Sequence, residues 1–278
     1  MSKSIIETIK SAISCKDTNY IHKVPNAGSI VTTPNGENVQ VMHNGVLVLV
    51  DAYYGSFMTE IVAGLNGHHE PQEEKIFHEI LKCIQPKATM VELGAYWSYY
   101  SLWFQSYVKD PSNYMVEPLT NAIDVGKKNF DINGKKGTFI QAYIGSNLDN
   151  LTQPKTITVD YILESENLNF IDILHSDIQG HEYDMLLGAQ NSIQAKKIQF
   201  IFISTHGLIV HSKCLRFLRK NDFFIIASHT PLESYSFDGL IVATSDPKFF
   251  QKIHISKKRV NPYLYIKSIL AKLYSIMK

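Results

Sequence analysis

Residues 88–104, ATMVELGAYWSYYSLWF, decide the fold of this 278-residue chain. The run ATMVEL is short and apolar, as in a buried strand, and Gly94 follows where the chain must turn into the helix predicted over 98–108. Apolar runs recur at 113–118, 137–145, 170–178 and 197–207, with helical segments between them. Apolar strands that alternate with helices predict an α/β fold, in which a mainly parallel sheet is covered on both faces. The runs at 222–230 and 238–245 predict a final antiparallel pair.

The composition suits a large soluble core, because 45% of the residues are hydrophobic and 19% are charged. A net charge of +1 argues against a nucleic-acid partner. The three scattered cysteines form no disulfide framework, and we find neither a signal peptide nor a run that could span a bilayer. We therefore expect a cytoplasmic protein.

The chain divides into three parts. We expect an N-terminal accessory segment over 1–69, with a helix and a hairpin that turns at Asn44-Gly45. The catalytic domain should span 70–250 and open with a helix near Pro71. The tail, 251–278, has seven basic and no acidic residues, which leaves −6 on the rest of the chain. Its amphipathic part, 262–278, fits docking on its own domain or on a dimer partner better than contact with a membrane surface.

Ligands of such sheets bind beyond the carboxyl ends of the strands, so the residues there matter most. The first strand ends in Glu92 and Gly94, where an acidic group can accept hydrogen bonds from an amine and a glycine admits a ligand closely. The second ends in Glu117 and Pro118, which places a carboxylate to bind both hydroxyls of a ribose. Neither a dinucleotide glycine fingerprint nor a P-loop is present. These features favour an adenosyl ligand such as S-adenosylmethionine.

Several stretches together resemble the FkbM family of S-adenosylmethionine-dependent methyltransferases. They are MVELGAYWSYYSLWF, YMVEP with Asn129 and Asn133 downstream, TVDYIL, and IDILHSDIQGHEYDMLLGA at 171–189. The resemblance covers about 68–210 and implies a Rossmann-like sheet of seven strands with a reversed last hairpin. It also implies methyl transfer, usually to a hydroxyl oxygen of a sugar, glycan or secondary metabolite.

The resemblance assigns expected roles to particular residues. Glu92, Gly94 and Tyr96 would contact the methionine part of the cofactor, Glu117 the ribose, and Ala142 and Tyr143 the adenine. The full predicted cofactor set also includes Ala95, Ser98, Pro118 and Asp177. This sequence departs from the family at Ser98, His175, Gln179 and Ser204, where glycine, lysine, glutamate and glutamate are frequent.

A hydroxyl is a weak nucleophile, so a base or a metal should activate it. In one mechanism His206 or His175 is the base and Asp177 orients it. In the other, Asp177 and His206 hold a divalent metal, as the aspartate at this strand end does in catechol methyltransferases by resemblance. Magnesium prefers oxygen ligands, so we favour the base without a metal.

Other residues near the site carry weaker signals. Tyrosines 53, 54, 99 and 100 are candidates to line an acceptor pocket, and His68-His69 to close over it. Glu182 caps the helix that begins near His181 or joins the site. A small-molecule or glycan acceptor is the expected partner, and a homo-oligomer is compatible with the sequence. The alternative functions are a nicotinamide-dependent oxidoreductase on a similar sheet and a non-catalytic adenosyl-binding module.

Overall fold

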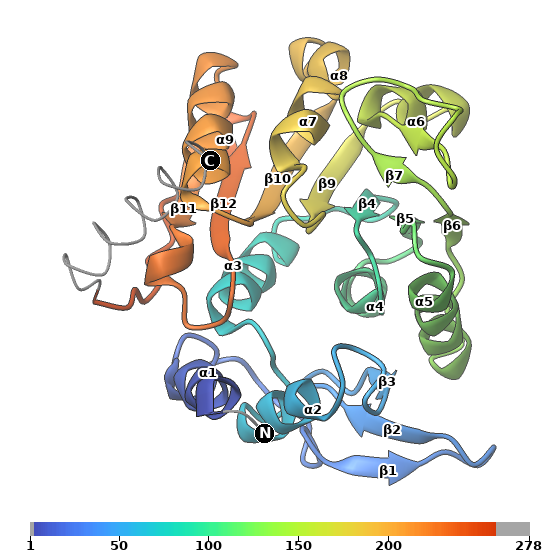
Figure 1. The fold of residues 1–278 in the computed structure, drawn as a ribbon, viewed down its shortest axis with the longest axis vertical. Helices are drawn as coiled ribbons and strands as arrows, with labels where there is room; N and C mark the ends of the chain where they lie inside the picture. Colours follow the sequence, from blue (N-terminus) through green and yellow to red (C-terminus); the bar gives the residue numbers. More distant parts are fainter. Residues whose placement is uncertain (1–2, 260–278) are drawn as a thin grey trace, which may run out of the picture.

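The structure is a computed structural model that describes residues 3–259. A seven-stranded sheet forms its centre, with helices on both faces (Figure 1). In spatial order its strands are β11 (Phe224–His229), β12 (Gly239–Thr244), β10 (Ile198–Thr205), β9 (Ile171–Ser176), β4 (Thr89–Leu93), β5 (Ser112–Val116) and β6 (Thr138–Ile140). Strand β12 runs antiparallel to β10 and β11, and the other neighbours are parallel. This confirms the predicted α/β fold with its reversed last hairpin.

The two faces of the sheet carry separate apolar layers, because successive side chains of a strand point to opposite faces. On β4, Met90 packs into one layer, whereas Val91 and Leu93 pack into the other. The first layer lies under α3 (Pro71–Leu81), α4 (Tyr99–Tyr107) and α5 (Thr120–Ile132). The second lies under α6 (Val159–Ser165), α7 (Glu182–Leu187), α8 (Gln190–Gln194) and α9 (Leu208–Lys220). A polar side chain on a strand therefore faces either the layer under α3, α4 and α5 or the layer under α6, α7, α8 and α9.

The N-terminal segment packs beside α3 and α5 (Figure 1). It consists of α1 (Lys3–Ser14), β1 (Ile30–Thr32), β2 (Asn38–Val41), β3 (Leu47–Leu49) and α2 (Ser56–Gly64). The β2–β3 hairpin turns at the predicted Asn44-Gly45 pair. The side-chain amide oxygens of Asn129 on α5 and of Asn133, directly after α5, accept hydrogen bonds at 2.9 Å from the backbone N–H groups of Leu49 and Leu47. These bonds fix the hairpin, and with it residues 53 and 54, over the sheet edge.

Two predicted elements are divided in the structure. The expected strand over 137–145 splits into β6 and β7 (Tyr143–Ile144), which leaves the central sheet to pair with β8 (Thr156–Ile157). The expected helix after His181 splits into α7 and α8 around Gly188. A side chain at Gly188 would overlap the backbone of Gly145, so close packing there accounts for the glycine. Two short 3-10 turns, Pro231–Glu233 and Pro247–Phe249, flank β12.

After the last strand, residues 251–259 run without regular structure along α3. The side-chain amide of Gln72 donates to the carbonyl of Ser256 at 2.7 Å, and Ile255 is buried. The amphipathic helix predicted over 262–278 lies outside the described residues. Within residues 3–259, no helix combines the length and apolar character needed to cross a bilayer.

Candidate active site

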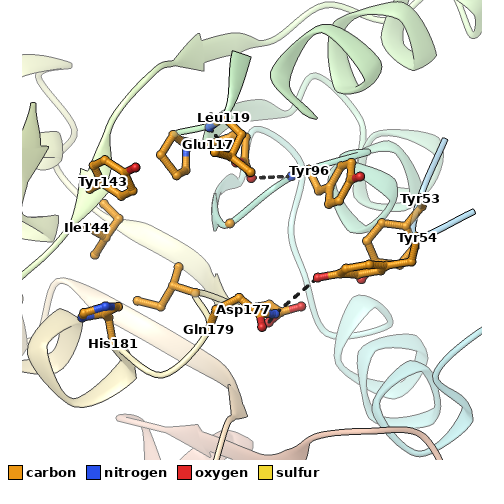
Figure 2. A pocket seen from close by; sticks show the side chains of 13 residues that line it. Tyr53, Tyr54, Tyr96, Glu117, Leu119, Tyr143, Ile144, Asp177, Gln179 and His181 are labelled. Carbon is orange, nitrogen blue, oxygen red and sulfur yellow. Dashed lines mark hydrogen bonds between the residues drawn. The ribbon is translucent and has the colours of Figure 1, made fainter. Parts of the chain in front are cut away.

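A cavity of about 490 Å³ opens at the carboxyl ends of β4, β5 and β9 (Figure 2). It is lined by Tyr53, Tyr54, Gly94, Tyr96, Glu117, Pro118, Leu119, Tyr143, Ile144, Asp177, Ile178, Gln179 and His181. Its volume lies in the range of small-molecule sites, roughly 300–1,000 Å³. We call it the first cavity. Of the predicted cofactor residues, the structure brings Gly94, Tyr96, Glu117, Pro118, Tyr143 and Asp177 together on its wall.

Gly94 shapes the floor of the first cavity. Its φ of +72° lies in the left-handed region that glycine adopts without cost. A side chain there would overlap the backbone carbonyl of Asp177. The backbone N–H of Asp177 in turn donates to the carbonyl of Leu93 at 2.9 Å. The ends of β4 and β9 can therefore approach each other only because residue 94 has no side chain.

Glu117 presents a fixed carboxylate to the first cavity. One of its oxygens accepts from the backbone N–H of Leu119 at 2.9 Å, and the other from that of Tyr96 at 3.1 Å. Each carboxylate oxygen has two lone pairs, so each keeps one for a ligand hydroxyl. Burial raises the pKa of Glu117, and these two N–H groups oppose the rise. The arrangement suits a pair of adjacent hydroxyls such as those of a ribose.

The wall beside Glu117 is mostly apolar, with Pro118, Leu119, Tyr143 and Ile144, and it suits a flat ring. Figure 2 shows Tyr143 and Ile144 on the side of Glu117 and Leu119, away from Tyr53 and Tyr54. An adenosyl group therefore fits the cavity: Glu117 would hold the ribose and this apolar end the adenine. Its methionine part would then lie toward Gly94 and Asp177.

Four predicted cofactor residues lie beneath the cavity and not on its wall. These are Glu92, Ala95, Ser98 and Ala142, all buried. The carboxylate of Glu92 accepts from the backbone N–H of Ser101 at 3.0 Å, in the first turn of α4. Ser98 has a φ of +58°, the conformation that the family's frequent glycine would adopt without strain, and its buried hydroxyl has no partner within residues 3–259.

A second cavity, of about 230 Å³, adjoins the first and shares Tyr53, Tyr54, Asp177 and Gln179 with it. The rest of its wall is formed by Phe57, Met58, Glu70, His206, Phe237 and Asp238. Aromatic rings and acidic groups thus face one another across a small space. Asp177 borders both cavities, so a group bound in either one can contact this carboxylate.

Asp177, His206 and Asp238 form a cluster on the wall of the second cavity. Nε2 of His206 lies 3.3 Å from Oδ1 of Asp177 and 3.3 Å from Oδ1 of Asp238. Nδ1 of the same ring is 2.7 Å from Oε1 of Glu182, which is fully buried. The predicted pair Asp177 and His206 is therefore brought together, and Glu182 fixes the orientation of the ring.

Burial controls the protonation of this cluster. Burial, together with the charge of Glu70, raises the pKa of Asp177 to about 8, although His206 acts against this rise. For His206, burial acts to lower the pKa, but the hydrogen bond of Glu182 and the charge of Asp238 outweigh it and raise the pKa to about 9. The pKa of Asp238 is raised to about 6, again mainly by burial. An aspartate with a raised pKa is a stronger base than an ordinary one.

His175 is turned away from both cavities. It lies on β9 opposite Glu92 of β4, on the face of the sheet that α3 covers. Its Nε2 is 2.7 Å from the carboxylate of Glu73 on α3, which also accepts from the hydroxyl of Ser204 at 2.9 Å. Asp177 lies two positions after His175, and strand alternation would give the two side chains the same face only if β9 continued past Ser176. His175 therefore supports α3, and its position does not suit a base.

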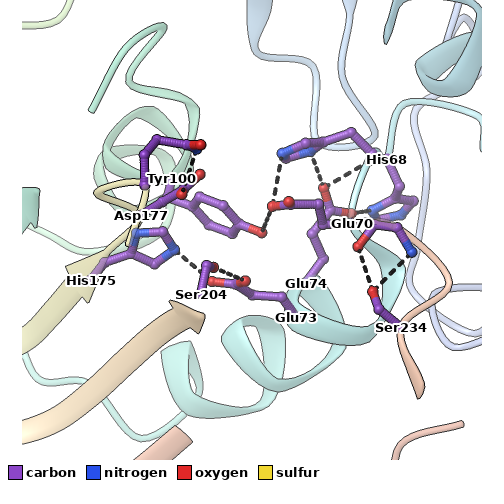
Figure 3. Close-up of polar contacts among 12 residues, drawn as sticks. His68, Glu70, Glu73, Glu74, Tyr100, His175, Asp177, Ser204 and Ser234 are labelled. Atoms are coloured by element: carbon purple, nitrogen blue, oxygen red, sulfur yellow. Dashed lines mark hydrogen bonds and ion pairs between the residues drawn. The ribbon is translucent and has the colours of Figure 1, made fainter. Parts of the chain in front are cut away.

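A second buried polar cluster contains His68, Glu70 and Glu74 (Figure 3), and His69 belongs to it as well. Both imidazoles contact the carboxylate of Glu74, and Nε2 of His69 lies 3.2 Å from Glu70. Burial acts to lower the pKa of His69, but the two carboxylates outweigh it and raise the pKa to about 10. The hydroxyl of Tyr100 also donates to Glu70, at 3.1 Å. These contacts hold Glu70 at the second cavity, whereas His68 and His69 line neither cavity.

Sequence reasoning missed Asp238 and Glu70. Asp238 precedes β12 and Glu70 precedes α3, so neither follows a parallel strand. The signals they offer are an Asp-Gly pair at 238–239 and an acidic residue before Pro71, and both occur at many ordinary turns and helix starts.

The chain is also similar to known proteins. The methyltransferase FkbM domain matches residues 83–225, just over half of the chain. No curated protein matches it. Solved structures with a similar fold include a precorrin-6y C5,15-methyltransferase from Geobacter metallireducens GS-15, at 12% identity and a TM-score of 0.43, over 62% of this chain and 88% of that one.

Two further structures are similar. TrmK of M. capricolum in complex with S-adenosylhomocysteine has 14% identity and a TM-score of 0.47, over 72% of this chain and 85% of that one. A putative rRNA methylase from Clostridium thermocellum has 10% identity and a TM-score of 0.47, over 62% of this chain and 94% of that one. The domain match, which spans Gly94, Glu117 and Asp177, shows that this chain belongs to the FkbM methyltransferase family, and it is a methyltransferase dependent on S-adenosylmethionine.

Proposed function

We propose that the protein transfers the methyl group of S-adenosylmethionine to a hydroxyl oxygen of a sugar, glycan or related metabolite. One observation carries this proposal: the second cavity, walled by aromatic rings and carboxylates, meets the cofactor cavity at Asp177. Carboxylates accept hydrogen bonds from hydroxyls, and aromatic faces pack against sugar rings. This wall therefore suits a small acceptor that carries several hydroxyl groups.

Asp177 is the proposed base. When bound, S-adenosylmethionine supplies a methyl carbon on a positively charged sulfur, which becomes a neutral thioether when an oxygen takes the methyl group. The acceptor proton passes to Asp177, whose Oδ1 faces His206 and whose Oδ2 is left for the hydroxyl. The raised pKa of Asp177, about 8, supports this role over that of a spectator carboxylate.

While no cation is bound, His206 acts as the charged partner of the base. Glu182 fixes its ring through Nδ1, and its Nε2 faces Asp177 and Asp238. This differs from the expectation that His206 or His175 takes the proton and Asp177 orients it. The base is assigned to Asp177 because it is the member of the cluster that borders both cavities.

Transfer of an isotope-labelled methyl group to a panel of nucleotide sugars and glycans tests the proposal. We expect label on a hydroxyl oxygen of at least one acceptor, and loss of labelling in Asp177→Asn. Asp124→Asn is the matched control, because Asp124 is exposed on α5 and lines neither cavity. Label found only on nitrogen or carbon would overturn the O-methyl assignment, and cofactor binding without turnover on the panel would favour a non-catalytic module.

A further inference from the structure

The Asp177–His206–Asp238 cluster has a feature that a simple base does not need. Nε2 of His206 is buried and has two carboxylate oxygens at 3.3 Å, yet it forms no hydrogen bond within residues 3–259. One ligand atom from each of the three residues lies within 4.8 Å of the other two. The three donors thus face one another, and Nε2 of His206 meets both carboxylates without a hydrogen bond in good geometry.

The spacing suits an ion at that point. Donor atoms bound at about 2.1 Å from a metal lie about 3.0 Å apart as neighbours in an octahedron and about 3.4 Å apart in a tetrahedron. The two separations of 3.3 Å fall between these values. An ion placed among the donors would bind the lone pair of a neutral His206 at Nε2, in place of the proton that faces Asp177 and Asp238.

The surroundings of His206 also suit a metal ligand. A ligating histidine almost always bonds its other ring nitrogen to a carboxylate, a backbone carbonyl or a water molecule, which fixes the orientation of the ring and makes it more basic. Glu182 does this here, at 2.7 Å and fully buried. Glu70 adds a third carboxylate to the same cavity, held by His69 and Tyr100.

We propose that Asp177, His206 and Asp238 bind one divalent cation of the Mn²⁺ class at the wall of the second cavity. The two carboxylates suit Mn²⁺ as they suit Mg²⁺, whereas the imidazole disfavours Mg²⁺, which prefers oxygen ligands alone. The cation binds through three protein donors and keeps open positions toward the cavity. An acceptor hydroxyl that takes one of them becomes more acidic and passes its proton to Asp177 Oδ2.

The part that the cation plays in catalysis rests on the proposed O-methyl transfer, whereas its binding does not. Titration of the full chain with Mn²⁺ alone, followed by electron paramagnetic resonance, measures binding directly. We expect one bound Mn²⁺ per chain, weakened at least tenfold by Asp238→Asn. Glu182→Gln should weaken it about 10- to 100-fold, as loss of the carboxylate behind a ligating histidine does.

Asp222→Asn is the matched control. Asp222 is exposed before β11, at the other end of that hairpin from Asp238, and its φ of +60° also suits asparagine. S-adenosylhomocysteine binding shows that each variant is folded. Absence of Mn²⁺ binding at millimolar concentration, or equal binding by the Asp238 and Asp222 variants, would overturn the site.

Chelation separates the two proposals. We expect methyl transfer to fall at least tenfold after exhaustive chelation and to recover with Mn²⁺. Methyl transfer that survives chelation would overturn the role of the cation and leave Asp177 as a base without a metal. Absence of O-methyl transfer with intact Mn²⁺ binding would overturn the proposed function and leave the metal site.

Discussion

Replacing Glu117 by glutamine should weaken cofactor binding by an amount that its hydrogen bonds set. Both carboxylate oxygens already accept a backbone N–H, at 2.9 and 3.1 Å, so each offers one lone pair to a ribose hydroxyl. Glutamine removes the charge and puts an NH₂ group in place of one oxygen, against a backbone N–H. One charge-assisted hydrogen bond is lost, which costs about 1.5–3 kcal/mol. The dissociation constant of S-adenosylhomocysteine should therefore rise about 10- to 150-fold.

Isothermal titration of both proteins with S-adenosylhomocysteine measures the change. Asp124→Asn serves as control, because it removes a negative charge from the helix that follows Glu117 without touching either cavity. Urea unfolding shows whether Glu117→Gln remains folded. A folded Glu117→Gln protein that binds within threefold of the wild type would refute the assignment of the ribose to Glu117.

Three further predictions follow from the same geometry. Gly94→Ala should lower the free energy of unfolding by at least about 3 kcal/mol, since the added methyl group would overlap the Asp177 carbonyl. Gly134→Ala, at a similar φ but with open space around it, should lower it by only about 1–2 kcal/mol. Equal decreases in the free energy of unfolding of the two variants, measured in urea, would contradict this. Ser98→Gly should raise the free energy of unfolding by about 1–2 kcal/mol, because glycine adopts the positive φ without strain and removes a buried hydroxyl that has no hydrogen bond within residues 3–259. A lower urea midpoint for this variant would count against the prediction. After exhaustive chelation, the residual methyl transfer should fall about tenfold per pH unit below about pH 8, since only ionised Asp177 accepts the proton and its pKa without a cation is raised to about 8. A flat rate of the chelated protein from about pH 6 to 8 would exclude Asp177 as the base.

The sequence predicts the cofactor side of the site well, because parallel strands bring their carboxyl ends to one edge of the sheet. Gly94, Glu117 and Asp177 each follow such a strand, and all three line the first cavity. Glu92 and His175 also sit near strand ends, but they point into the layer under α3. Whether a side chain at a strand end faces the cavity or the core depends on the residue at which hydrogen bonding to the neighbouring strand stops. The amino-acid sequence does not specify that residue.

The acceptor side depends on contacts between distant segments. Asp238 comes from the connection to the reversed strand, and Glu70 from the start of α3, where His69 and Tyr100 hold it. Tyr53 and Tyr54 reach the site because Asn129 and Asn133 anchor the N-terminal hairpin to α5. Neither periodicity nor spacing encodes such packing, so these residues become visible only in the folded chain.

A crystal structure with S-adenosylhomocysteine tests the central claim most directly, namely that the two cavities hold cofactor and acceptor on either side of Asp177. We expect the ribose hydroxyls to bind Glu117, the adenine to lie by Tyr143 and Ile144, and the sulfur to face the second cavity across Asp177. An adenosyl group bound elsewhere, or a sulfur that faces away from Asp177, would contradict it.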